Sequence, residues 1–181
     1  MRKRNGTILC VLLALVALTF TAVLPASAAD DTLVIGVYYY DADGNLITDV
    51  YGTPLNPPYF GYNLTHAQVA FDDIAHLTAL TGAARAEVRL FTDVTTALTV
   101  PAGTTATLNL NGFTLSTAGA TAPLTVAAGG TLTVTDTSAD KSGSIAYTGS
   151  AAVSAIDNRG KLTVATANVT TASTAALISN S

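Results

Sequence analysis

A motif that recurs along the second half of the chain limits its fold more than any other feature. "VAAGGTLTV" at 126–134 returns as "IDNRGKLTV" at 156–164, while "VPAGTTATL" at 100–108 is a looser copy and "ISNS" at 178–181 begins another. These copies start 26, 30 and 22 residues apart, and such periods indicate stacked repeats. Each copy reads as two short apolar strands separated by Gly or Asn turns, which predicts one coil of a β-solenoid. Loops bulging from one corner, chiefly "TDTSADKSGS" at 135–144, would absorb the unequal intervals.

The stretch "LNLNGFTL" at 108–115 predicts how one coil turns. Alternation along a strand sends Leu108 and Leu110 into the core and Asn109 outward. Asn111 and Gly112 then form the corner, because Asn and Gly accept the left-handed backbone that a sharp turn needs.

Asn158 and Asn180 occupy equivalent places in their copies, 22 residues apart. Two interpretations stay open for them. They stack as an Asn ladder, as side chains do in cross-β stacks, or each is simply a turn residue. Both interpretations support a coil.

The first part of the chain differs from the repeats. Residues 1–28 combine basic "MRKR", an apolar run and an Ala26-Ser27-Ala28 site, which predicts a cleaved secretory signal peptide. Residues 29–62 predict a β-hairpin around "DADGN" followed by a Pro-rich connection. Residues 63–86 predict an amphipathic helix, started by Asn63 or Thr65 and ended by Gly82, that caps the first coil. The solenoid coils are expected at 87–181.

Cleavage of the signal peptide would change the charge and the chemistry of the chain. It removes Cys10, the only cysteine, and therefore excludes disulfides, thiol catalysis and Cys zinc sites. It also removes three of the eight basic residues, leaving five against 12 acidic ones, a net charge of −7. The remaining bases form no run, so we expect no nucleic-acid binding. We also expect no membrane span in the mature chain.

Three ordered segments carry a resemblance: "AEVRLFTDVTTALTVPAGTTATLNLNGFTL", then "GGTLTVTDTSADKSGSI", then "AIDNRGKLTV". Together they resemble the right-handed parallel β-helix of the pectate-lyase-like superfamily, in particular the solenoids of large bacterial cell-surface proteins. The resemblance covers roughly residues 86–181. It implies an all-β fold and a secreted or surface location more firmly than any activity.

The last residues, "AALISNS", begin a coil without the Gly-x-Leu-x-Val strand that follows in earlier copies. We therefore expect the chain to be the N-terminal fragment of a longer protein. An open coil at this end would also expose strand edges, which favours self-association.

One candidate metal site lies in the predicted hairpin. Asp41, Asp43 and Asn45 alternate along "DADGN", a spacing at which oxygen atoms can hold calcium. The loop departs from the EF-hand pattern, because Gly44 stands at the fourth position instead of the sixth and Gly52 stands where a Glu is required. A hairpin turn is the simpler interpretation.

The histidines, the charged residues of the coils and the tyrosines are the other candidates for chemistry. His66 and His76 are ten residues apart, a spacing that does not favour a shared metal. A polysaccharide lyase or hydrolase needs carboxylates clustered on one face, whereas the charged residues of the coils do not repeat from copy to copy: Asp93, Asp136, Asp140, Asp157, Arg159, Lys141 and Lys161. We interpret them as solvated loop residues. Tyrosines gather near the front of the chain, where packing is a more common use than sugar binding.

These observations predict a secreted bacterial surface protein whose β-solenoid is a non-catalytic stalk or adhesin segment, with no cofactor. Cell wall, host glycan or host protein are the expected partners. Two alternatives stay open. One is a polysaccharide lyase or hydrolase whose site lies in missing downstream coils, and the other is a self-assembling solenoid.

Overall fold

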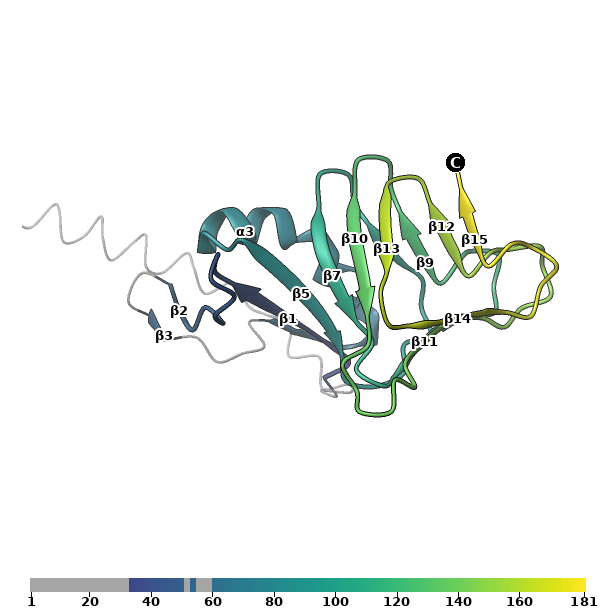
Figure 1. Cartoon of the computed structure of the whole chain (residues 1–181), viewed down its shortest axis with the longest axis horizontal. Coiled ribbons are helices and arrows are strands. Elements are labelled where there is room, and N and C mark those ends of the chain that lie inside the picture. Colours follow the sequence, from purple (N-terminus) through teal and green to yellow (C-terminus); the bar gives the residue numbers. More distant parts are fainter. Residues whose placement is uncertain (1–32, 51–52, 55–59) are drawn as a thin grey trace, which may run out of the picture. The chain divides into compact units, whose positions relative to one another are not determined.

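Parallel strands stack coil upon coil through most of the chain (Figure 1). The computed structural model describes residues 33–50, 53–54 and 60–181, which lie in the compact unit Thr32–Ser181. The predicted signal peptide falls outside them. Three full coils follow one another: β7 (Thr105–Asn109), β8 (Thr114–Thr117) and β9 (Leu124–Val126); β10 (Thr131–Thr135), β11 (Ser144–Tyr147) and β12 (Ile156–Asn158); β13 (Lys161–Val164), β14 (Asn168–Thr171) and β15 (Ile178–Asn180). An earlier partial coil holds β5 (Arg85–Leu90) and β6 (Leu98–Val100).

Each coil contributes one strand to each of three sheets. The first sheet runs β13-β10-β7-β5 and continues into β1 (Ile35–Tyr40) and β4 (Phe60–Tyr62), the second runs β14-β11-β8, and the third runs β15-β12-β9-β6. Pairing between coils is parallel throughout. The expected all-β solenoid is therefore confirmed.

The core consists of inward rows that cross the coils in register. The rows are Val88, Leu108, Val134 and Val164 in the first sheet, Val94, Leu115, Ile145 and Val169 in the second, and Leu98, Leu124, Ile156 and Ile178 in the third. The first three members of each row are fully buried. Burial of one such side chain contributes about 2 kcal/mol, so the repeated apolar positions of the sequence supply the main driving force for stacking.

The corners carry loops of unequal length. The corner between the first and second sheets is short at 110–113 and 165–167 but longer at 136–143. The corner between the second and third sheets also varies, from 118–123 to 148–155. The corner between the third and first sheets shortens from 127–130 to 159–160. The expectation that the loops bulge from one corner is therefore wrong, because all three corners absorb the unequal intervals.

Two antiparallel strands extend the first sheet at its front. Strand β1 pairs with β5 on one side and with β4 on the other. The expected turn at "DADGN" forms, closed by a hydrogen bond from Asp41 N to Asn45 O. The returning segment adds a bridge between Tyr40 and Leu46 and a hydrogen bond from Ile47 N to Tyr39 O, beyond the part of β1 that pairs with β4. A further two-stranded ladder joins β2 (Asp49–Val50) and β3 (Thr53–Pro54).

A short helical region lies over the partial coil, where one helix was expected. It consists of a 3-10 turn η1 (Leu64–His66), α2 (Val69–Asp72) and α3 (Ile74–Thr81). The Asn63 side chain accepts from His66 N and caps the first turn, and Gly82 ends α3 in the left-handed conformation. Phe71 and Ile74 are buried in the core.

Candidate functional site

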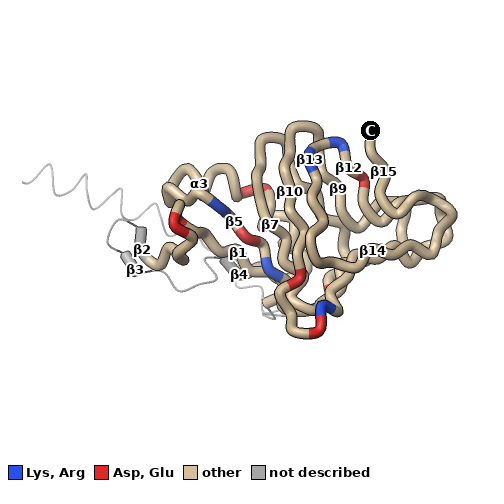
Figure 2. The backbone as a smooth tube through the Cα atoms, in the orientation of Figure 1, with Lys and Arg blue, Asp and Glu red and all other residues tan. Residues whose placement is uncertain are grey.

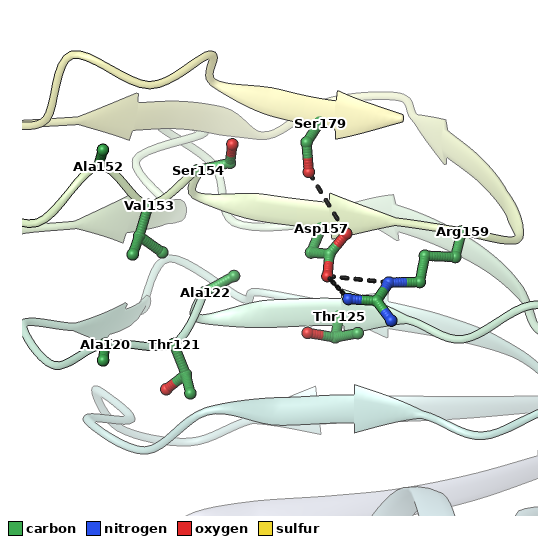
Figure 3. A pocket seen from close by; sticks show the side chains of 10 residues that line it. All are labelled: Ala120, Thr121, Ala122, Thr125, Ala152, Val153, Ser154, Asp157, Arg159 and Ser179. Atoms are coloured by element: carbon green, nitrogen blue, oxygen red, sulfur yellow. Dashed lines mark hydrogen bonds and ion pairs between the residues drawn. The ribbon is translucent and has the colours of Figure 1, made fainter. Parts of the chain in front are cut away.

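A groove of about 550 Å³ crosses the outer surface of the third sheet (Figure 3). The 118–123 and 148–155 loops form one end of the groove, and the sheet supplies one polar residue from each of three successive coils. The lining residues are Ala120, Thr121, Ala122, Thr125, Ala152, Val153, Ser154, Asp157, Arg159 and Ser179. Small apolar side chains of the two loops therefore lie next to a strip of hydrogen-bonding side chains on the sheet.

The strip is a register row of the third sheet, in which Thr125, Asp157 and Ser179 are direct neighbours. Arg159 bends back over this row, and its Nε and Nη2 donate to Asp157 Oδ2 at 3.1 and 2.7 Å. Ser179 Oγ donates to the other oxygen, Oδ1, at 3.3 Å. The hydrogen bond to Asp157 raises the pKa of Arg159. The interpretation of both as loop residues holds for Arg159, which lies in the turn after β12 with its side chain folded back, and is wrong for Asp157, which lies on β12.

Asn158 and Asn180 lie in register on neighbouring strands of this sheet. Asn158 Nδ2 donates to Asn180 Oδ1 at 2.8 Å, and Asn158 Oδ1 accepts from Gly160 N at 3.3 Å. The earlier members of the row are Val126 and Val100, so the ladder begins at the third strand of the sheet. Gly160 must remain glycine, because a Cβ there would collide with the carbonyl oxygens of Gly130 and Ala127.

Asn111 and Gly112 lie at a different corner, the one after β7. Their φ angles are 51° and 87°, the left-handed values that a sharp corner requires. Asn111 Nδ2 donates to Leu90 O at 3.1 Å, which ties this corner to the partial coil. The structure therefore brings Asn158 and Asn180 together but not with Asn111.

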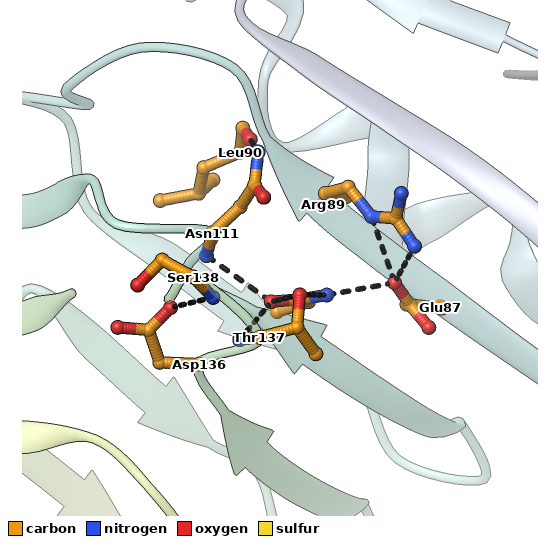
Figure 4. A network of polar contacts seen from close by, with 8 residues as sticks. Glu87, Arg89, Leu90, Asn111, Asp136, Thr137 and Ser138 are labelled. Carbon is orange, nitrogen blue, oxygen red and sulfur yellow. Dashed lines mark hydrogen bonds and ion pairs between the residues drawn. The ribbon is translucent and has the colours of Figure 1, made fainter. Parts of the chain in front are cut away.

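Asn109 anchors a polar network on the outer side of the first sheet (Figure 4). Its Nδ2 donates to Glu87 Oε1 at 3.0 Å and to Thr137 Oγ1 at 2.8 Å. Arg89 completes the network with two hydrogen bonds to Glu87 Oε1, at 2.9 and 2.6 Å. Asn109 points outward from the coil, as expected, but the 136–143 loop folds over it and leaves it 0% exposed.

Asp136 secures that loop. Its carboxylate accepts from three backbone N–H groups: Gly112 at 3.0 Å, Ser138 at 2.9 Å and Gly143 at 2.6 Å. Burial raises the pKa of Asp136, but the hydrogen bonds outweigh burial and hold the pKa below its usual value. Asp140 lies in the same loop, accepts from Ser142 and also has a lowered pKa because of those hydrogen bonds. Lys141 Nζ donates to Asp136 O at 2.8 Å.

The candidate calcium site in "DADGN" is a turn that is closed by hydrogen bonds among its own residues. Asp41 Oδ1 accepts from Asp43 N at 3.0 Å and Asn45 N at 2.8 Å, and Oδ2 accepts from Asn45 Nδ2 at 3.1 Å. Hydrogen bonds from Asn45 lower the pKa of Asp41. Among the residues that the structure describes, no group of three or more His, Cys, Asp or Glu side chains is arranged to hold a metal ion.

The remaining candidates are dispersed. His66 is exposed and contacts Asn63 through its ring, while His76 is exposed on α3. Asp93 accepts from Thr114 N at 2.8 Å, and Lys161 is exposed at the start of β13. Figure 2 shows the few charged positions of the coils mainly on β5, in the loop after β10 and near β12 and β13.

The front tyrosines split between core and surface. Tyr39 is fully buried, whereas Tyr38 and Tyr40 lie on the outer face beneath two guanidinium groups. Arg89 stacks on Tyr38 at 4.5 Å from the ring centre and Arg85 on Tyr40 at 4.1 Å. Burial, with the charge of Asp73, raises the pKa of Tyr62 to about 12. Tyr51 and Tyr59 lie outside the described residues.

No match emerged when the chain was compared with protein-family models, with curated proteins and with solved structures. Within the part of the chain that the structure describes, no helix has the length and apolar character needed to cross a membrane. The candidate function therefore depends on the geometry of the coils and on the sequence.

Proposed function

We propose that this chain is a non-catalytic β-solenoid segment of a secreted bacterial surface protein, working as a stalk or adhesin. One observation carries the proposal. Among the residues that the structure describes, the carboxylates of the coils accept hydrogen bonds from backbone N–H groups and side chains of the same chain. Each coil then serves as a rigid layer whose side loops are free to vary.

The hydrogen-bond and ion-pair partners of the carboxylates support this proposal. Asp93 and Asp136 accept backbone N–H groups, and Glu87 and Asp157 pair with neighbouring arginines. A general acid at neutral pH needs a raised carboxyl pKa. In contrast, the pKa values of Asp136 and Asp140 are lowered, as expected for carboxylates that stabilise loops.

The parallel ladders supply stiffness. Neighbouring coils are joined along all three sheets, so bending the stack strains ladders on several sides at once. The surface that results is rich in Thr and Ser, for example the outward row of Thr107, Thr133 and Thr163. Such a stack suits a spacer that holds recognition loops away from a cell.

Export can be tested directly in a bacterial host. The chain of residues 1–181 and a variant lacking residues 1–28 would be expressed side by side, and intact cells would be treated with an added protease. We expect the chain with residues 1–28 to be cleaved to the mature chain and found outside the cytoplasm, and the shortened variant to stay inside. Retention of both chains inside the cell would contradict the proposal.

A polysaccharide lyase or hydrolase is the second candidate, favoured by the Asp157–Arg159 pair on an open groove. Acidic and neutral polysaccharides would be incubated with the purified chain, and new unsaturated bonds and reducing ends would be measured. We expect neither product. Turnover that disappears in Asp157→Asn would establish the enzyme instead.

A further inference from the structure

We infer that the groove over the third sheet binds a short neutral oligosaccharide, with Asp157, Arg159 and Ser179 as the recognition residues. This inference rests on the proposed function and deepens it, because it names the class of ligand that the chain would bind as an adhesin.

The groove has the dimensions of a ligand site. Its volume of about 550 Å³ falls within the range of ordinary small-ligand pockets. The polar strip spans three parallel strands, so it extends about 10 Å across the coils. That length suits linked rings lying across the strands.

The polar strip offers donors and acceptors together. The Asp157 carboxylate holds Arg159 through Oδ2 alone, which leaves capacity at Oδ1 beyond the long contact from Ser179. The Arg159 side chain is 59% exposed, so its outer N–H groups can reach a ligand. Adjacent sugar hydroxyls donate to a carboxylate and accept from a guanidinium, and hydrogen bonds to charged groups are the stronger kind.

The remaining lining suits the apolar side of a sugar ring. Ala120 and Ala152 are small exposed side chains of this lining, and Val153 is half-buried, so a ring can lie flat with its C–H face against them. Large side chains are missing from this lining, which leaves the charged pair accessible across the width of the groove.

Charge favours a neutral ligand over an acidic one. Arg159 is already neutralised by Asp157 at 2.7 Å, and the whole chain carries a formal net charge of −4. A uronate or sulfated sugar would meet the Asp157 carboxylate without a spare cation, and the field of the chain would repel it.

The test is calorimetric titration of the full chain with cellohexaose, chitohexaose, mannohexaose, xylohexaose and maltohexaose, and with trigalacturonate as the acidic probe. We expect at least one neutral probe to bind. Arg159→Gln and Ser179→Ala should weaken that binding, the first at least tenfold. Lys161→Gln, which removes an equal charge outside the groove, should leave it unchanged.

Thermal unfolding of each variant would show that the fold is retained. The inference is overturned if none of the neutral probes binds, if only trigalacturonate binds, or if Arg159→Gln binds as tightly as the unmodified chain. The export experiment is independent of this groove. Export with no glycan binding would therefore refute the groove alone, and glycan binding without export would refute the surface role alone.

Discussion

The side chain of Gln68 pairs with both backbone groups of Thr99, as a neighbouring strand would. Its Oε1 accepts from Thr99 N and its Nε2 donates to Thr99 O, each at 2.7 Å. Thr99 lies on β6, the strand at the front end of the third sheet. One amide from the helical region therefore closes an edge that would otherwise be open to another chain.

Replacement of Gln68 should loosen this edge. Gln68→Ala removes both hydrogen bonds, and we expect a loss of about 2 kcal/mol in the free energy of unfolding. Gln68→Glu is the matched variant, since its carboxylate still accepts from Thr99 N but no longer donates to Thr99 O. Amide hydrogen exchange at Thr99 should accelerate in Gln68→Ala and less in Gln68→Glu. Equal exchange in all three chains would show that the pairing is not formed.

An aspartate at Leu132 should prevent the coils from stacking. Leu132 is 1% exposed and lies between Ala106 and Leu162, so Leu132→Asp would bury an unpaired charge. Leu132→Ala should cost about 3 kcal/mol. Thr133→Asp, on the outer side of the same strand, is the control. Circular dichroism and melting should show loss of structure in Leu132→Asp only, and an unchanged melt would mean that the inward assignment is wrong.

The loop after β10 should make the free energy of unfolding depend on pH in the acid range. The folded pKa of Asp136 is lowered, so its contribution is present above the unfolded value of about 3.9 and is lost as pH falls through the lower folded pKa. Asp136→Asn should be less stable than the unmodified chain at pH 7, and the gap should narrow below about pH 4. Urea unfolding at a series of pH values measures this gap. A gap that stays constant down to strong acid would rule out Asp136 as the cause.

A double-mutant cycle would measure the ladder between Asn158 and Asn180. The two amides share one hydrogen bond of 2.8 Å at a partly exposed position, so we expect a coupling of about 0.5 kcal/mol between Asn158→Ala and Asn180→Ala. Asn158→Ala paired with Asn168→Ala, on the second sheet, is the control and should show additive effects. Additive effects in the ladder pair would favour two independent turn residues.

The sequence predicted the features that repeat locally. The spacing of the apolar positions placed Leu108 and Leu110 in the core, and the Asn111–Gly112 dipeptide predicted a left-handed corner. Such features depend on backbone preference and on alternation along a strand, so a single sequence carries them.

Features that join distant segments could not be predicted in the same way. Asn109 is covered by a loop 28 residues further on, and Gln68 reaches Thr99 across 31 residues. The pairing of β1 with β5 likewise joins distant residues, such as Ile35 and Leu90. The groove was missed for the same reason, since Asp157 and Ser179 meet only after two coils have stacked.

The most direct test of the stacked coils is the distance between Thr107 and Thr133, which are register partners on the outer side of β7 and β10. Spin labels would be attached at Thr107→Cys and Thr133→Cys in a chain with Cys10→Ser, and dipolar broadening measured by electron paramagnetic resonance. Parallel stacking places their Cα atoms about 4.8 Å apart, so we predict strong broadening, with weaker broadening for Thr107 paired with Thr163 two coils away. Absence of broadening in the first pair, or equal broadening in both, would contradict the solenoid.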